Sequence, residues 1–176
     1  IVYVALVLFA FSCEKPPEPE PVSLEPEMPP LTHTGANTFG CYIDGELFVA
    51  NEGPSVWSIP PVSGSFNEEN GLLNLQGTRY RTNEDDNIRI NAYLDSGVGE
   101  YEYALFDGKI LGYRNWNGSS CDYYYENNPN LGRLTISHFD PSKNILSGTF
   151  YMTLTNSDCG DKPDVKITEG RFDFRY

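Results

Sequence analysis

The sequence is poor in positive charge, although acidic residues are plentiful. Its 12 lysines and arginines stand against 25 aspartates and glutamates, which gives a formal net charge of -13. Nucleic-acid binding needs clustered Lys and Arg, so this balance argues against a nucleic-acid partner. Bare anionic lipid would repel the same charge, so any attachment to a membrane has to come from an anchor.

Several motifs that carry chemistry are also missing. The two histidines, His33 and His138, are far apart, and neither a CxxC nor an HExxH pattern occurs, so we expect no transition-metal site. The acidic segment 83–87 offers oxygens for weak Ca²⁺ binding, but it lacks the spaced ligand pattern, and a solvated turn is the simpler expectation. No phosphate-binding glycine loop precedes a helix, and no stretch has a capped helical period. We therefore expect no cofactor.

The first twelve residues are apolar or small and end directly at Cys13. This run is too short to cross a hydrocarbon core, which takes roughly 20 residues, and it fits the apolar part of a secretory signal. Because no Met or basic leader precedes it, we expect the sequence to begin inside the signal peptide, 1–12. The end of the run resembles a lipobox, although 10–12 lacks the usual Leu. Cys13 is predicted to be lipidated; an ordinary signal peptide with an incidental cysteine is the alternative.

A proline- and glutamate-rich segment follows Cys13. Residues 14–30 contain seven prolines and five glutamates, a composition typical of an extended, solvated chain. We expect 13–31 to be a tether about 50 Å long. The acidic residues after Cys13 are similar to surface-export signals of Bacteroidetes lipoproteins, although Lys15 interrupts them. These features predict a protein held by its lipid in the outer membrane, facing the periplasm or the cell surface.

Residues 32–176 are expected to form one all-β domain. Asp44-Gly45 predicts a tight hairpin whose two faces are both apolar, which suggests an interior position. Alternation over 88–94 and 146–154 predicts strands with one buried face. The apolar phase changes within 165–176, which predicts a bulge with Gly170 in the left-handed conformation. The pattern as a whole indicates about eight to ten antiparallel strands in a meander, closed into a sandwich or a partly open barrel.

Three motifs in this domain resemble those of a known family. They are TGANTFGC at 34–41, SGTF at 147–150 and ITEGRFD at 167–173. In this order they are similar to the TGxNTFGC, SGTF and ITxGRFD motifs of a family of uncharacterised Bacteroidetes lipoproteins. The resemblance spans the domain and implies a lipoprotein location and a shared fold, but no activity.

The domain contains three cysteines in an oxidising compartment. Cys121 and Cys159 lie near predicted turns, and we expect a disulfide between them. Cys41 falls in the predicted hairpin and is interpreted as a small buried hydrophobe. A Cys–His pair would need His33, at the tether boundary, or His138, which shares a strand face with apolar residues. We therefore assign no catalytic residue.

Aromatic residues are the most suggestive candidates for ligand contacts. The set consists of Tyr113, Trp116, Tyr123, Tyr124 and Tyr125. On exposed loops these rings would stack on sugars or anchor a protein partner. The simpler alternative is that they pack over the sheet, as most aromatic side chains do in β domains.

The leading hypothesis is a lipid-anchored binding module for a glycan, a peptide or a small apolar molecule. A lipocalin-like cavity is one version of it, and a filled interior would exclude that version. The alternative is an envelope hydrolase, although with 25 acidic residues any carboxylate pair can be nominated. An outer-membrane barrel is a third reading, opposed by Cys13, by the tether and by polar outward positions. The oligomeric state is left open.

Overall fold

The computed structural model describes residues 26–54, 59–82, 85–103, 110–116, 120–125, 132–157, 160 and 163–176. All regular structure in these ranges is β-strand, as the alternating apolar pattern predicts. None of the described segments is a helix long and apolar enough to cross a membrane. Cys13 and most of the predicted tether, 13–31, lie outside these ranges.

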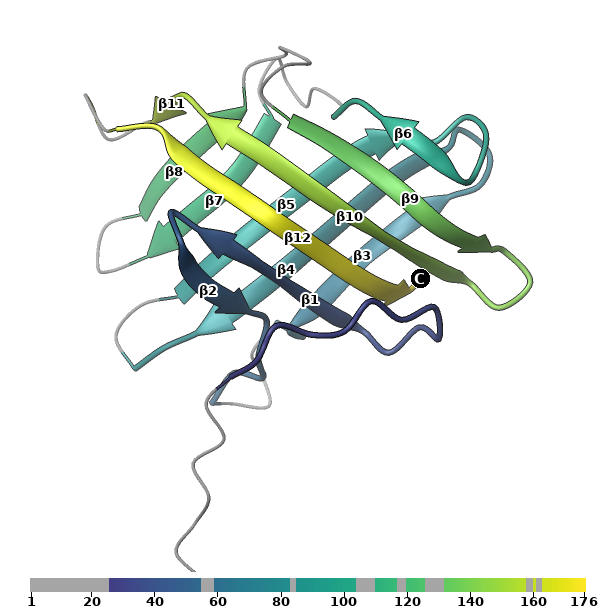
Figure 1. The fold of residues 1–176 in the computed structure, drawn as a ribbon, viewed down its shortest axis with the longest axis horizontal. Coiled ribbons are helices and arrows are strands. Elements are labelled where there is room, and N and C mark those ends of the chain that lie inside the picture. Colours follow the sequence, from purple (N-terminus) through teal and green to yellow (C-terminus); the bar gives the residue numbers. More distant parts are fainter. Residues whose placement is uncertain are drawn as a thin grey trace, which may run out of the picture.

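The strands form two antiparallel sheets that lie face to face, with their strands running in crossing directions (Figure 1). Sheet A has the order β2 (Glu46–Val49), β1 (Thr38–Ile43), β12 (Val165–Arg175), β10 (Ile145–Leu154), β9 (Gly132–Asp140) and β6 (Gly99–Tyr101). Sheet B has the order β11 (Asn156–Ser157), β8 (Ser120–Tyr125), β7 (Ile110–Trp116), β5 (Asp85–Tyr93), β4 (Leu72–Tyr80) and β3 (Val62–Asn67). The predicted all-β antiparallel fold is confirmed in its sandwich form, and the described ranges contain twelve strands rather than the expected eight to ten.

The order of strands is sequential in most places. β1–β2, β3–β4–β5, β7–β8 and β9–β10 pair as neighbours in the chain, which is the meander pattern. The last strand departs from it, because β12 is inserted between β1 and β10. Sheet A is therefore held together by a pairing between the two ends of the domain.

The Asp44-Gly45 hairpin forms as predicted. Cys41 pairs with Phe48, and the two turn residues have φ of 49° and 87°, as a type I′ turn requires. Its expected interior position is wrong for β2, which is the edge strand of sheet A. The edge is partly covered, because Arg79 from β4 donates a 2.7 Å hydrogen bond to the carbonyl oxygen of Leu47.

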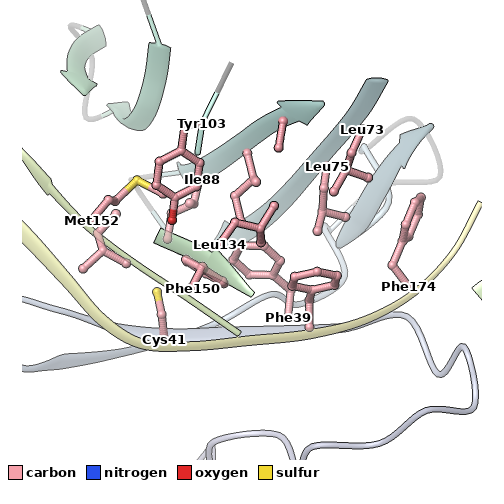
Figure 2. Packing of buried hydrophobic residues seen from close by; sticks show 14 of the residues in the cluster. Phe39, Cys41, Leu73, Leu75, Ile88, Tyr103, Leu134, Phe150, Met152 and Phe174 are labelled. Atoms are coloured by element: carbon pink, nitrogen blue, oxygen red, sulfur yellow. The ribbon is translucent and has the colours of Figure 1, made fainter. Parts of the chain in front are cut away.

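Large side chains of sheet A pack directly against glycines of sheet B. A Cβ atom added at Gly77 in β4 would lie 2.4 Å from the ring of Phe39 in β1. At Gly112 in β7, an added Cβ would lie 2.4 Å from a methyl group of Leu154 in β10. Figure 2 shows side chains from both sheets meeting in one continuous cluster. At these points the interior is filled, which argues against the lipocalin-like version of the binding hypothesis.

The bulge expected near the C-terminus is present, but a different residue is left-handed. β12 shifts register between Thr168 and Arg171 against β1, and between Ile167 and Gly170 against β10. Glu169 has the positive φ, 51°, whereas Gly170 does not. Gly170 is needed for a different reason, because an added Cβ there would lie 2.6 Å from the ring of Phe150. The glycine makes room for a core aromatic side chain beside the bulge.

Candidate functional site

The three sequence motifs meet at one buried carboxylate, that of Asp173. Both Thr32 and Thr34 donate hydroxyl hydrogen bonds to it, at 2.6 and 3.1 Å. The backbone N–H groups of Thr34, Gly35 and Ala36 donate at 2.9, 2.8 and 3.2 Å, and the hydroxyl of Ser147 donates at 2.8 Å. We call Asp173 and these donors the Asp173 latch. The motifs thus have a structural explanation, since the latch holds the start of the domain against β10 and β12.

Hydrogen bonding controls the protonation of this carboxylate. Burial by itself would raise the pKa of Asp173, but the hydroxyl and N–H donors around it hold the pKa well below its ordinary value. The carboxylate is fully buried and charged at neutral pH. It acts as the acceptor that orders 32–36, and no reaction needs to be assigned to it.

The chain already packs against sheet A before the predicted domain boundary at residue 32. Pro29 is buried, and a Cβ atom added at Gly40 in β1 would lie 2.6 Å from its ring. The expectation that the proline-rich segment stays solvated as far as residue 30 is therefore wrong at Pro29, whereas Pro30 is exposed. Pro29 packs on Gly40 because that glycine leaves a hollow in the outer face of sheet A.

The two histidines, which we expected to be unrelated, stack on each other. The rings of His33 and His138 are 4.9 Å apart between centroids and are inclined by 7°. A register shift in β9 near Ser137 turns His138 out of the core row that contains Ile136, which corrects its predicted position. No third ligand joins them, because the described residues contain no group of three or more His, Cys, Asp or Glu placed to hold a metal ion.

The cysteines lie in different environments. Cys41 is free and fully buried, as predicted, and burial raises the pKa of its thiol far above the ordinary value, which Arg79 opposes only weakly. A thiol in this state is a packing group rather than a nucleophile. Cys121 lies on β8, and Cys159 lies outside the described residues, so their disulfide stays a prediction.

The aromatic candidates lie on strands rather than on loops. Tyr113 on β7 is 8% exposed, and its hydroxyl donates to Asp86 at 3.0 Å, so this ring packs within the sandwich, as the simpler alternative expects. Tyr123 on β8 stacks on Tyr113, with centroids 5.5 Å apart, and packs against the core. The backbones of Trp116, Tyr124 and Tyr125 belong to the same two strands, but their side chains are outside the described part of the structure.

Asp86, from the segment considered for Ca²⁺, has cationic partners instead. Its fully buried carboxylate lies 2.7 Å from both Arg79 and Arg81. Arg79 also reaches Glu46 on β2, at 3.0 Å, and its guanidinium lies over the ring of Phe48. This ionic cluster connects sheet B to the edge of sheet A. Asp86 is therefore a buried structural residue, so the expectation of a solvated turn over 83–87 is wrong at this position.

A cavity of about 580 Å³ lies at the end of the sandwich away from the Asp86 ionic cluster, where three connections meet. We call it the end cavity. It is open to solvent and is bordered by the turn after β3, the loop after β5 and the turn after β9, which lie on the right-hand side of Figure 1. Its aromatic wall consists of Phe66 and Phe139, whose rings are 5.4 Å apart in an edge-to-face arrangement. Three carboxylate residues line it, Glu68, Glu69 and Asp95, and none of the described lining residues is basic.

Hydrogen bonds within the walls hold the end cavity open in one shape. Asn67 accepts from the N–H of Glu69 at 2.8 Å, which fixes the turn after β3. The N–H of Leu94 donates to the carbonyl of Gly71 at 2.8 Å, which ties that turn to the loop after β5. Tyr101 fixes the same loop by donating to the carbonyl of Gly97 at 2.7 Å. The walls are therefore preorganised for a ligand.

The C-terminal tyrosine extends the aromatic wall. The ring of Tyr176 packs edge-to-face on Phe66 at 5.3 Å, and its hydroxyl donates to Glu68 at 3.3 Å. Burial raises the pKa of Tyr176 to about 12, and the negative charges of Glu68 and Asp140 add to the rise. A neutral, hydrogen-bonding tyrosine therefore persists beside the carboxylates at any physiological pH.

Sequence reasoning did not find the end cavity, although one signal was available. Asn70-Gly71 is a hairpin dipeptide of the type that favours tight turns, and it marks the end of the β3–β4 connection. It would have shown β3 and the turn that carries Glu68 and Glu69. No local pattern brings these residues next to Phe139, which lies about 70 positions further along the chain. The comparisons with family models, curated proteins and solved structures found no match for this chain.

Proposed function

We propose that this protein is a binding module of the cell envelope, held in the outer membrane by a lipid on Cys13, with the end cavity as its ligand site. The motifs at 34–41, 147–150 and 167–173 support membership of the Bacteroidetes lipoprotein family that they resemble. The Asp173 latch supports the tethered arrangement, because it fixes the point from which the N-terminal segment departs.

The single observation that carries the binding proposal is the make-up of the end cavity. Its volume of about 580 Å³ lies in the range of ligand pockets, and its walls are hydrogen-bonded in place. Carboxylates at Glu68, Glu69 and Asp95 are acceptors, so the complementary ligand is rich in donors. The aromatic wall offers an apolar surface to the flat face of a sugar ring. We propose a saccharide as the ligand, and an amino sugar in particular, because its ammonium group would pair with the carboxylates.

The experiment is a calorimetric titration of the full chain with a glucosamine oligosaccharide. The test variant is Glu68→Gln/Asp95→Asn, which keeps the side-chain shapes and removes two charges from the end cavity. The matched control is Glu52→Gln/Asp164→Asn, which removes two exposed charges elsewhere. The proposal expects the test variant to lose binding about tenfold or more, while the control binds like the parent. Equal losses in both variants would show that binding depends only on general charge attraction, and they would overturn the proposed site.

A second titration, with the N-acetylated oligosaccharide, separates the two parts of the ligand proposal. Removing the ammonium charge should weaken binding while the sugar rings still reach Phe66 and Phe139. Tighter binding of the acetylated form would contradict the pairing with carboxylates. The alternative of an envelope hydrolase gains no support from the described residues, which place no activated nucleophile in the end cavity.

A further inference from the structure

Two of the seven arginines have no partner for their guanidinium groups among the residues that the structure describes. Arg79 and Arg81 pair with Asp86, Arg114 pairs with Asp122, Arg89 donates to Gln76, and Arg175 donates to two backbone carbonyls. Arg133 and Arg171 make no side-chain hydrogen bond or ion pair with the described residues. Both are half-buried. In a chain with a net charge of -13, two neighbouring unpaired cations are unusual.

These two arginines line the same hollow, on the outer face of sheet A. The hollow has a volume of about 240 Å³, and we call it the arginine groove. Arg171 on β12 pairs in register with Thr149 on β10, and Thr149 pairs with Thr135 on β9. Arg133 is two residues before Thr135, so the two arginine Cα atoms are about 12 Å apart diagonally across three strands. Long side chains from both positions can converge on one group above β10.

The rest of the arginine groove combines an exposed aromatic ring with two hydroxyl groups. Tyr151 on β10 is 48% exposed, in register with Arg133, and it is one of few large apolar side chains on the surface. Two threonine hydroxyls, of Thr135 and Thr149, lie between the arginines. An exposed tyrosine ring beside hydroxyls and cations suits a ring-shaped ligand with hydroxyl groups and one negative charge.

The β12 bulge places one acidic residue at the border of this groove. Glu169 lines it, has φ of 51°, and makes no ion pair with Arg133 or Arg171. A non-glycine residue in this conformation is strained, and such strain is common where a bulge re-aims side chains at a binding site. The carboxylate of Glu169 does not neutralise the groove internally, so both guanidinium groups are available to an external anion.

We propose that the arginine groove is a second ligand site, which binds the carboxylate of an acidic saccharide. The guanidinium of Arg133 or Arg171 donates two parallel hydrogen bonds to the carboxylate, the second arginine adds charge, and Tyr151 lies against the sugar ring. This site is separate from the end cavity, which lies at one end of the sandwich and has the opposite charge. The arginine groove therefore suits an anionic sugar, whereas the end cavity suits a cationic one.

The test is a calorimetric titration of the full chain with an oligomer of galacturonic acid, compared with the same oligomer reduced to neutral galactose. Arg133→Gln and Arg171→Gln should each weaken binding of the acidic oligomer about tenfold, because neither guanidinium is used to hold the fold. Arg89→Gln is the matched control, since it removes the same charge from sheet B and should leave binding unchanged. Glu169→Gln should strengthen binding, because it removes a like charge from the groove. Melting temperatures of all four variants show that each remains folded.

The outcomes separate this proposal from its rivals. Binding of the acidic oligomer that is lost with either groove arginine, together with no binding of the neutral oligomer, supports it. Equal binding of the neutral oligomer, unchanged binding in Arg133→Gln and Arg171→Gln, or an equal effect of Arg89→Gln would overturn it. Sodium acetate and inorganic phosphate, titrated alone, should bind far more weakly than the oligomer; comparable affinity would reduce the site to a general anion site. A negative result for the arginine groove would not count against the end cavity. The two sites are tested by different variants, and Glu68→Gln/Asp95→Asn does not alter this groove.

Discussion

The hydroxyl of Ser147 donates a hydrogen bond of 2.8 Å to the buried carboxylate of Asp173. This contact joins the SGTF motif to the ITEGRFD motif, and the donors of 32–36 add the N-terminal motif to the same carboxylate. Residues that are 26 to 141 positions apart therefore form one latch. It ties the start of the domain to its last strand.

Replacing the latch carboxylate should destabilise the domain. Asp173→Asn keeps the shape but removes the charge and one acceptor, and should cost about 3 kcal/mol of unfolding free energy, measured in urea. Asp164→Asn is the control, because that residue is exposed, and its cost should stay within about 0.5 kcal/mol. Equal midpoints for the two variants would show that the latch does not stabilise the fold.

The same carboxylate predicts a dependence of stability on pH. The pKa of Asp173 in the folded protein lies below that of an unfolded aspartate, which is about 3.9. Its contribution is therefore fully present above about pH 4 and is lost as the pH falls through the folded pKa. The difference between the urea midpoints of the parent and of Asp173→Asn should narrow steadily as the pH falls from about 4 towards 2. A constant difference over this range would contradict the assignment.

The sequence predicted the parts of the fold that depend on local pattern. Alternation located the strands of 88–94 and 146–154, and Asp44-Gly45 located the first hairpin, because both signals act over a few residues. The pairing of β12 with β1 was not predicted, since it joins residues about 130 positions apart and carries no local signal. His138 was misplaced for a related reason, because one bulge in β9 reverses the face of every later residue.

The ionic cluster at Asp86 predicts a large cost when one partner is lost. Asp86→Asn leaves the guanidinium groups of Arg79 and Arg81 without their buried anion, and should destabilise the fold by about 3–5 kcal/mol. Glu46→Gln removes the exposed partner of Arg79 and should cost less than about 1 kcal/mol. Chemical unfolding of the two variants measures the difference. Similar values for both would mean that burial of Asp86 carries no special weight.

The packing of Phe39 on Gly77 predicts a site that tolerates no added methyl group. In Gly77→Ala the new Cβ would overlap the Phe39 ring, and the domain should lose about 1–3 kcal/mol of stability. Gly99→Ala is the control, because the nearest atom to its added Cβ is 3.6 Å away. The double variant Gly77→Ala/Phe39→Leu should recover part of the loss. A loss that Phe39→Leu does not reduce would place the strain elsewhere.

The predicted Cys121–Cys159 disulfide has a direct test by mass spectrometry. Alkylation of the denatured, unreduced domain should modify Cys41 but neither of the other two cysteines, because Cys41 is free. Reduction before alkylation should add two further modifications. Three modified domain cysteines without reduction would show that the pair is not bonded.

The end cavity is less visible in the sequence than the core, for a physical reason. Its residues come from three connections, and connections carry no repeating pattern that shows which of them meet. Phe66 and Phe139 look like ordinary strand residues until the sheets are assembled. The same holds for Arg133 and Arg171, because their lack of partners among the described residues becomes apparent only when every other arginine has been placed.

The most direct test of the binding proposal is a map of backbone amide shifts by NMR during titration of the full chain with the glucosamine oligosaccharide. The account predicts that the shifts concentrate in 66–71, 94–97 and 139–141, which border the end cavity, and that they disappear in Glu68→Gln/Asp95→Asn. Shifts that concentrate elsewhere, or that persist unchanged in this variant, would contradict it.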